Sequence, residues 1–235
     1  MKQEPMLFHV DRLELAFKPK RWAFADERRA EIDAYFAKRQ RENPALWNGR
    51  VLLLYHQVVK DGVFRGDFLE TDYASFSTWK AWGRPPAGIH DCFGAASVAG
   101  ADRAFLLGVM GPHTFNAGEI YFPSGTPDLD DIKDSQVDLE FSVRRELNEE
   151  TGLDAAELET EPGWNCVLDG ALIVQIKLMR SSRSADELRA RILAHLAREK
   201  QPELSDIRIV RGPTDFDSSM PRFVTAFLAQ QFAVG

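Results

Sequence analysis

Residues 145–153 place three glutamates on one face of a predicted helix. Glu146, Glu149 and Glu150 stand at positions i, i+3 and i+4, which share one side of a helix. Like charges at this spacing repel each other, and the C-terminal half of a helix disfavours anions. A chain that folds in this way needs a positive charge at this face, and a bound divalent cation would supply it.

The same helix is predicted to bury an apolar stripe next to these carboxylates. Leu139, Val143 and Leu147 recur at helical spacing, and Glu150 projects at the edge of their stripe. A carboxylate left there without a partner is unfavourable. Clustered hard oxygen ligands suit Mg²⁺ or Mn²⁺, which keep several waters and bridge to substrate phosphates. The alternative is a solvated helix face that ion pairs stabilise and that binds no metal.

The sequence of residues 145–153, Arg-Glu-Leu-Asn-Glu-Glu-Thr-Gly-Leu, resembles the second half of the Nudix box without a mismatch. Residues 122–125, Phe-Pro-Ser-Gly, resemble the stretch that enters that box. Resemblance to Nudix hydrolases implies a central mixed sheet sandwiched between helices, with the box as a loop–helix–loop that holds metal ions. The motif is specific for the family and carries no information on the substrate.

The resemblance also implies roles for individual residues. Glu146, Glu149 and Glu150 match metal-binding carboxylates and are, together with Arg145, the expected catalytic residues. The backbone carbonyl near Gly125 matches a further metal ligand, and Arg145 matches the residue that holds the box together. The implied cofactor is Mg²⁺ or Mn²⁺, which polarises a phosphoryl oxygen, generates hydroxide and neutralises charge on the leaving phosphate.

One part of the box departs from the family pattern. Between Gly125 and Arg145 the chain is longer than the standard box by about six residues, which indicates a loop extension over residues 127–136. Val137 replaces the first glutamate of the box, whose family role is to pair with the arginine, so no metal ligand is lost. Asp138 is also well placed to cap the helix. Three acids are candidates for the pairing, and the choice stays open: Asp131, Asp138 and Glu140.

Hydrophobic periodicity predicts strands and helices in irregular alternation. Strands are expected over residues 6–17 with a break near Asp11, 51–59, 63–71, 92–98, 104–110, 120–122, 158–168, 171–179 and 206–210. Helices are expected over residues 24–41, 72–82, 139–151, 184–200 and 219–232. This order favours mixed layers, α/β in the broad sense and α+β in detail. We expect an N-terminal α/β extension at residues 1–85 and a catalytic domain at 86–235, or else one compact domain.

Charge and composition limit the classes of function. The net charge is −7, and no run of Lys or Arg is long enough to bind polymeric DNA or RNA. Cys92 and Cys166 are far apart, so buried thiols are expected instead of a disulfide framework or a zinc site. The N-terminus lacks the apolar stretch of a signal peptide, and no segment is long enough to span a membrane. We expect a cytoplasmic protein.

Residues outside the box supply further candidates for the site. His113 and Phe115 lie in a loop between two strands that enter the box, where they are candidate contacts for a base or ribose. Arg84 is a candidate contact for a phosphate. A simple surface role is the alternative for each of them. Acids that follow the predicted helix 184–200 are candidates for the general base: Glu199, Glu203 and Asp206.

The leading hypothesis is hydrolysis of a phosphoanhydride bond in a nucleoside diphosphate linked to a group X, giving a nucleoside monophosphate and phospho-X. Residues 42–50 are loosely similar to a stretch in a Nudix branch that acts on nucleotide sugars, and ADP-ribose is the next candidate. Their simpler interpretation is a helix stop followed by a turn. The alternatives are a coenzyme A diphosphatase and a Nudix-fold nucleotide sensor without catalysis. The resemblance also implies a homodimer.

Overall fold

The computed structural model describes residues 4–44 and 46–234. The chain forms two compact units. Unit 1 comprises Met1–Asp11, Phe93–Gly125 and Leu139–Gly235, and unit 2 comprises Arg12–Cys92 and Thr126–Asp138. Each unit is therefore assembled from segments that are distant in sequence. No helix in the described part of the chain is both long and apolar enough to cross a membrane.

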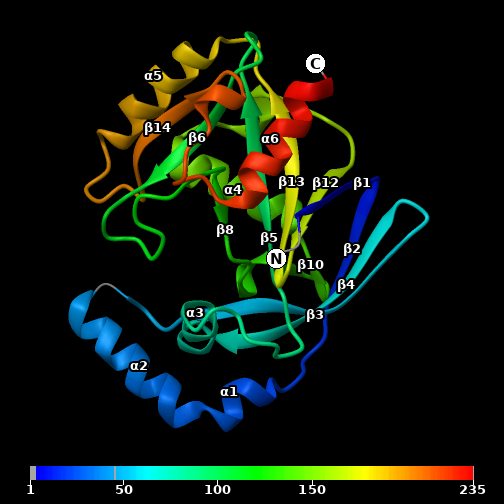
Figure 1. The fold of residues 1–235 in the computed structure, drawn as a ribbon, viewed down its shortest axis with the longest axis vertical. Coiled ribbons are helices and arrows are strands. Elements are labelled where there is room, and N and C mark those ends of the chain that lie inside the picture. Colours follow the sequence, from blue (N-terminus) through cyan, green and yellow to red (C-terminus); the bar gives the residue numbers. More distant parts are fainter. Residues whose placement is uncertain (1–3, 45, 235) are drawn as a thin grey trace. The chain divides into compact units, whose positions relative to one another are not determined.

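Unit 1 is built on a sheet with the strand order β1–β12–β13–β5–β6–β14 (Figure 1). The short strands β11, β7 and β8 pair with β13, β6 and β5 respectively. The strands are β1 (Met6–Val10), β5 (Asp91–Ala99), β6 (Phe105–Met110), β7 (Ile120–Tyr121), β8 (Ser124–Gly125), β11 (Glu159–Thr160), β12 (Trp164–Asp169), β13 (Leu172–Arg180) and β14 (Leu204–Val210). The helices are α4 (Leu139–Thr151), α5 (Ala185–Leu196) and α6 (Arg222–Val234).

Helices α4 and α6 cover opposite faces of this sheet. Phe93 and Gly94 are neighbours on β5, so they point to opposite faces. Phe93 packs edge-on against Phe223 of α6, with ring centroids 6.1 Å apart. A Cβ atom on Gly94 would collide with the side chain of Val143, which places α4 directly over that glycine. The expectation of a mixed α and β fold, with a sheet between helices, is thereby confirmed.

Unit 2 contains a smaller sheet with the strand order β3–β4–β2–β10–β9. β2 runs parallel to β4, whereas β3 runs antiparallel to β4 and β10 runs antiparallel to β2. The β3–β4 hairpin turns at Asp61 and Gly62, which both have the positive φ of a type I′ turn. The strands are β2 (Arg12–Phe17), β3 (Arg50–Lys60), β4 (Val63–Asp72), β9 (Ile132–Lys133) and β10 (Gln136–Val137). The helices are α1 (Ala23–Glu27), α2 (Arg29–Glu42) and α3 (Tyr73–Ala81).

The start of α3 depends on two polar side chains. Asp72 accepts a hydrogen bond from the Ser75 amide at 2.9 Å, which confirms it as the expected N-cap. Asn48 accepts another from the Ala74 amide at 2.7 Å. Asn48 belongs to residues 42–50, so this contact supports the simpler interpretation of that stretch as a turn that leads into the next element.

The loop extension predicted within the box is a β-hairpin in the structure. Strands β9 and β10 turn at Asp134 and Ser135, whose φ values of 49° and 63° again match a type I′ turn. Gln136 of β10 is paired with Ala16 of β2, and the Phe17 amide donates to the Ser135 carbonyl at 2.9 Å. The extension therefore adds two strands to the sheet of unit 2.

Several expected elements differ from the observed ones at their ends. The helix expected over residues 24–41 is divided at Arg28 into α1 and α2. The strand expected over residues 158–168 is interrupted before Trp164, because Gly163 adopts a left-handed φ of 71°. Helix α5 ends at Leu196 instead of residue 200, and α6 begins after Pro221 instead of at residue 219.

The compact units differ from the division into residues 1–85 and 86–235 in three places, one of which is that residues 86–92 belong to unit 2. β1 belongs to unit 1 because it pairs with β12 along its whole length. Residues 126–138 belong to unit 2 because β10 pairs with β2. The expected break near Asp11 is confirmed, and it is the point at which the chain leaves one sheet for the other.

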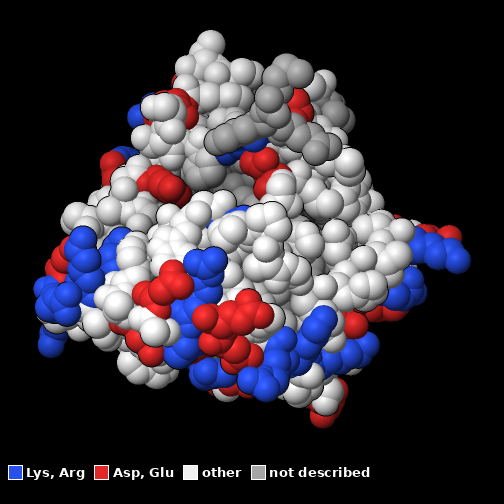
Figure 2. Space-filling view, turned by 60° about the horizontal axis from the view of Figure 1, so that its bottom comes forward, with Lys and Arg blue, Asp and Glu red and all other residues white. Residues whose placement is uncertain are grey.

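Surface charges of both signs are interspersed on the face of the molecule that Figure 2 shows. Helix α2 illustrates this pattern, since Arg29 forms an ion pair with Asp33 and Lys38 forms one with Glu42. The two cysteines are buried and not in a disulfide, as expected. Burial raises the pKa of the Cys166 thiol to about 12, which keeps it protonated.

Candidate active site

Helix α4 presents its glutamates at very different depths. Leu139, Val143 and Leu147 are fully buried, which confirms the apolar stripe. Glu150 is also buried, with 4% of its surface exposed, whereas more than half of the Glu149 side chain is exposed. The box helix therefore brings a carboxylate into the protein interior and leaves its neighbour at the surface.

Arg145 lies between the two other glutamates of the box. Its guanidinium is 3.1 Å from the Glu146 carboxylate and 3.5 Å from that of Glu149. The Arg145–Glu149 pair expected for a metal-free helix face is therefore present, but it does not involve Glu150. Ion pairing along the helix accounts for two of the carboxylates and leaves the buried one to be explained.

The carboxylate of Glu150 is only partly satisfied. The Ser124 amide donates to its Oε1 atom at 3.3 Å, and Oε2 has no hydrogen-bond partner among the described residues. Burial raises the pKa of Glu150 well above its ordinary value, and the negative charges of Glu203 and Glu146 raise it further. A buried carboxyl oxygen without a donor is the environment that a bound cation relieves, so this residue fits a metal ligand.

Gly125 stands directly beside the carboxylate of Glu146. β8 pairs with β5 through Gly125 and Gly94, and this pairing fixes the backbone at that point. A Cβ atom on Gly125 would overlap the Glu146 side chain. The two residues predicted to share a metal site are thus neighbours, and only glycine leaves room for the carboxylate.

The described side chains alone do not form a complete metal-binding site. Within residues 4–44 and 46–234, no group of three or more His, Cys, Asp or Glu side chains is placed to hold a metal ion. An ion at Glu150 would have to take further ligands from backbone oxygens or water. Mg²⁺ commonly binds in this manner, through one or two carboxylates with several retained waters.

Of the three acids expected to follow α5, Glu203 is the one next to the box. Glu199 contacts His195 at 3.1 Å, and Asp206 forms an ion pair with Arg189 at 2.7 Å. Glu203 lies close enough to Glu150 to raise its pKa. Although Glu203 is exposed at the surface, surrounding protein atoms exclude water from part of its carboxyl group and raise its own pKa.

The predicted nucleotide-contacting loop reaches the same acid. The Gly111 amide donates to the Glu203 carbonyl at 2.8 Å, which anchors the loop to the start of β14. His113 lies near Glu203, and its positive charge opposes the rise in the pKa of that carboxyl. His113 is thereby brought to the glutamates, while the role of Phe115 in the same loop stays a prediction.

Arg84 belongs to unit 2, where it forms an ion pair with the buried Asp91 at 3.0 Å. Its predicted role at a phosphate stays a prediction.

Among the candidates to replace the first box glutamate, Glu140 pairs with Arg144 at 2.7 Å. Asp131 accepts a hydrogen bond from the Asp128 amide at 3.0 Å. The partner that takes over the pairing with Arg145 stays open.

Sequence reasoning missed two groups that lie beside Glu150. Tyr121 is buried, its hydroxyl accepts a hydrogen bond from Asn116 at 3.0 Å, and burial raises its pKa, with a further contribution from Glu150. The Ser124 amide is the other group, and a backbone donor has no sequence signal of its own. The sequence predicts a strand over residues 120–122, but its three apolar residues in a row do not indicate which side chain faces Glu150.

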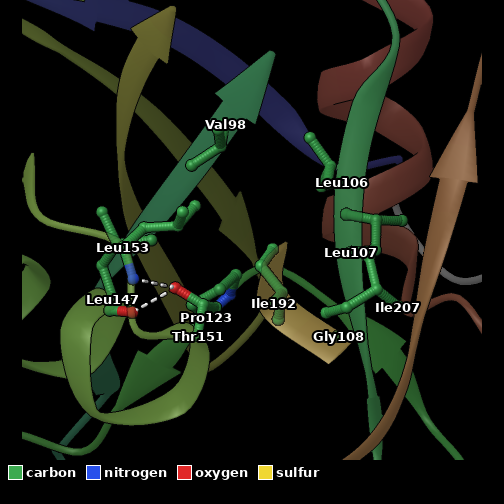
Figure 3. A pocket seen from close by; sticks show the side chains of 10 residues that line it. All are labelled: Val98, Leu106, Leu107, Gly108, Pro123, Leu147, Thr151, Leu153, Ile192 and Ile207. Carbon is green, nitrogen blue, oxygen red and sulfur yellow. Dashed lines mark hydrogen bonds between the residues drawn. The ribbon is translucent and has the colours of Figure 1, made fainter. Parts of the chain in front are cut away.

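A small cavity lies beside α4 and α5 (Figure 3). It is lined by apolar residues of the sheet, α4 and α5, together with Thr151. The Thr151 hydroxyl contacts the Leu147 carbonyl and accepts a hydrogen bond from the Leu153 amide. Because no polar side chain remains available, this space is a packing defect of the core and not a phosphate site. The lining residues are Val98, Leu106, Leu107, Gly108, Pro123, Leu147, Thr151, Leu153, Ile192 and Ile207.

Of the comparisons with known proteins, the one with solved structures gives matches. No protein-family model matches the chain, and no curated protein matches it. RenU, a Nudix hydrolase from M. smegmatis, aligns with a TM-score of 0.39 and 14% identity over 62% of this chain and 84% of RenU. The MutT protein from Methanosarcina mazei Go1 aligns with a TM-score of 0.39 and 16% identity over 62% of this chain and 94% of that protein. These values describe a distant likeness.

Proposed function

We propose that the chain is a Nudix-type hydrolase that uses Mg²⁺ or Mn²⁺ to cut a phosphoanhydride bond in a nucleoside diphosphate linked to a group X. The observation that carries this proposal is the buried Glu150, whose Oε2 atom lacks a donor among the described residues while Glu146, Glu149 and Glu203 lie nearby. Burial and the negative charges of these neighbouring carboxylates make the ionised form of Glu150 unfavourable unless a cation binds there.

Glu146, Glu149, Glu150 and the backbone carbonyl of Gly125 are the residues that would hold the ion. When bound, the ion would polarise a phosphoryl oxygen and neutralise charge on the leaving phosphate. The Ser124 amide fixes one oxygen of Glu150, and the other has no donor among the described residues and so is available to a cation. Arg145 orients the other two carboxylates of the helix through its ion pairs.

Glu203 is the proposed general base. Its raised pKa moves the carboxyl towards neutral pH, where a base accepts a proton most effectively. In this scheme Glu203 takes a proton from water, and the water oxygen forms a bond to phosphorus. The bond from phosphorus to the bridging oxygen then breaks. The products are a nucleoside monophosphate and phospho-X, and the proton resides on Glu203.

Nucleotide sugars are the first candidate for the substrate and ADP-ribose is the second, with coenzyme A as a third within the same class of reaction. The likeness of residues 42–50 to a nucleotide-sugar branch is the sequence observation that favours the first of these. A homodimer belongs to the same proposal, and sedimentation of the full chain tests it. The three intact box glutamates favour catalysis over a sensor that binds nucleotide without hydrolysis.

The test is product release from a panel of nucleoside-diphosphate derivatives in the presence of Mg²⁺, with products identified by mass. Wild type is compared with Glu149→Gln and Glu150→Gln. Glu157→Gln is the matched control, because Glu157 lies outside the box and pairs with Arg191 at the surface. We expect a metal-dependent turnover that falls by orders of magnitude in the two box variants and stays near the wild-type value in the control.

Two results would overturn the proposal. Turnover that persists in EDTA would exclude the metal-dependent mechanism. Turnover of none of the substrates, combined with a nucleotide that still raises the melting temperature, would favour the nucleotide sensor. In that case the intact carboxylates would serve binding alone.

A further inference from the structure

The last turn of α4 carries two of the proposed metal ligands, and local hydrogen bonds close it without involving the Glu149 carbonyl: Asn148 donates to the Leu153 carbonyl at 3.3 Å, and the Leu153 amide donates to the Thr151 hydroxyl at 3.2 Å. It contains no basic residue, although a helix C-terminus favours positive charge or hydrogen-bond donors. The Gly152 amide donates to the Asn148 carbonyl at 2.8 Å, which closes the turn. The next carbonyl, that of Glu149, lies beyond this contact and faces the neighbouring helix α5.

His195 of α5 lies against this turn in two ways. Its Nε2 atom is 3.4 Å from the Glu149 carbonyl and 3.1 Å from the carboxylate of Glu199, which follows the C-terminal end of α5. Its ring also covers Gly152, whose φ of 67° is left-handed. A Cβ atom on Gly152 would lie 2.6 Å from the Cγ atom of the ring, so the glycine and the histidine fit each other closely.

We infer that His195 is a positioning residue for the box: through its contacts with the Glu149 carbonyl and Gly152 it fixes the last turn of α4 and so holds Glu149 and Glu150 in place for the metal ion. This inference rests on the function proposed above. A ligand-bearing helix end that can rotate or fray would misplace the carboxylates, and small displacements of metal ligands weaken binding. The Glu199 carboxylate lies next to the same Nε2 atom, so Glu199 and the Glu149 carbonyl share that N–H as acceptors.

Simple helix packing does not require a histidine at this position. The contact between α4 and α5 already has apolar residues on both sides, since Leu147 and Ile192 line the same cavity. The polar contact of His195 is instead made with the backbone of a box residue. A phenylalanine would keep the ring over Gly152 and remove only the hydrogen-bonding nitrogen, which separates the two roles.

The experiment is a titration of Mn²⁺ by calorimetry or by the spectrum of the free ion, on the full chain without substrate. The variants are His195→Phe, which keeps the ring, and His195→Gln, which restores a donor. Arg198→Gln is the control, because Arg198 is exposed at the same end of α5. We expect the Kd for Mn²⁺ to rise roughly tenfold in His195→Phe, as outer-shell losses do, and to return towards wild type in His195→Gln.

The outcomes separate this inference from the proposed function. If wild type binds no Mn²⁺, the proposed function fails first. If wild type binds Mn²⁺ and His195→Phe binds it equally well, the positioning role of His195 is overturned while the proposed function stands. If His195→Phe loses both stability and Mn²⁺ binding, rescue by His195→Gln supports the inference, and absence of rescue reduces His195 to a packing residue.

Discussion

Replacing Glu150 by glutamine is expected to stabilise the metal-free protein. Glu150 is buried, and one of its oxygens lacks a partner among the described residues. Glutamine has the same shape, keeps an oxygen that accepts from the Ser124 amide, and removes the buried charge. A buried unpaired group is unfavourable by about 1–3 kcal/mol, or more when charged, and part of this remains because the new amide also lacks a partner. The expected net gain is ~1–2 kcal/mol at pH 8.

The sign of the pH dependence follows from the raised pKa of Glu150 in the folded state. Between the unfolded value of about 4.3 and the folded value, the folded protein binds more protons than the unfolded chain. The contribution of Glu150 to the free energy of unfolding is therefore complete when the pH is below the unfolded pKa. It is lost as the pH rises through the folded pKa. Each pKa unit between the two states corresponds to about 1.4 kcal/mol. Glutamine does not titrate, so Glu150→Gln does not lose stability in this way as the pH rises.

The assay is thermal unfolding in EDTA at pH 5 and pH 8, repeated at pH 8 with Mg²⁺. In EDTA at pH 8, the melting temperature of Glu150→Gln should exceed that of wild type by roughly 2–8 °C, at about 2–4 °C per kcal/mol for a chain of this size. Saturating Mg²⁺ should reverse the order, because ligand at a hundred times its Kd stabilises wild type by about 2.7 kcal/mol. A variant that is less stable than wild type in EDTA at pH 8 would refute the reasoning.

Three further variants test other contacts. Glu203→Gln should lower kcat by about 10²-fold or more, as removal of a general base does, and should change the Kd for Mn²⁺ little. A kcat equal to that of wild type would exclude Glu203 as the base. Gly125→Ala should displace the Glu146 carboxylate and abolish the rise in melting temperature on addition of Mg²⁺; a retained rise would contradict the predicted Gly125 site. Ser135→Gly should raise the free energy of unfolding in urea by roughly 0.5–1 kcal/mol, because it relieves a left-handed backbone; an unchanged value would show that the turn is unstrained.

The elements that the sequence predicted well are those with a local signal. Helix α4 has an apolar period, and Gly152 ends it with the positive φ expected of a C-terminal glycine. Asp72 and the capping box at Ser184 mark the starts of α3 and α5, and both caps are present. In each case, residues within about four positions of each other decide the structure, so the sequence pattern is sufficient.

The β9–β10 hairpin had no such signal. Its strands are two residues long, so no period can be read from them. Asp134 and Ser135 of its turn have a left-handed conformation, whereas glycine is the residue that usually indicates such a turn in a sequence. Its pairing partner, Ala16 of β2, is far away in sequence. The structure of this segment is determined by the pairing of β10 with the distant strand β2, and a single sequence does not indicate that pairing.

The site shows the same division between local and distant information. The spacing of Glu146, Glu149 and Glu150 follows from helix geometry alone, and so their common face was predictable. Glu199, Glu203 and Asp206 are equivalent in the sequence because nothing local separates one acid near a helix end from another. The tertiary fold separates them by giving partners to the first and the last and by placing Glu203 near Glu150.

The covalent path of the chain argues against treating unit 2 as a detachable extension. The chain passes from one unit to the other after residues 11, 92, 125 and 138. The last two of these positions directly follow Gly125 and directly precede α4, so the insertion within the box folds as part of unit 2. A fragment that begins at Phe93 would lack β1, leaving β12 without its neighbour, and would lack β2, leaving β10 without its partner. The box and both units therefore have to be studied in the full chain, since Gly125 and α4, which carry the proposed metal ligands, are each continuous with residues of unit 2.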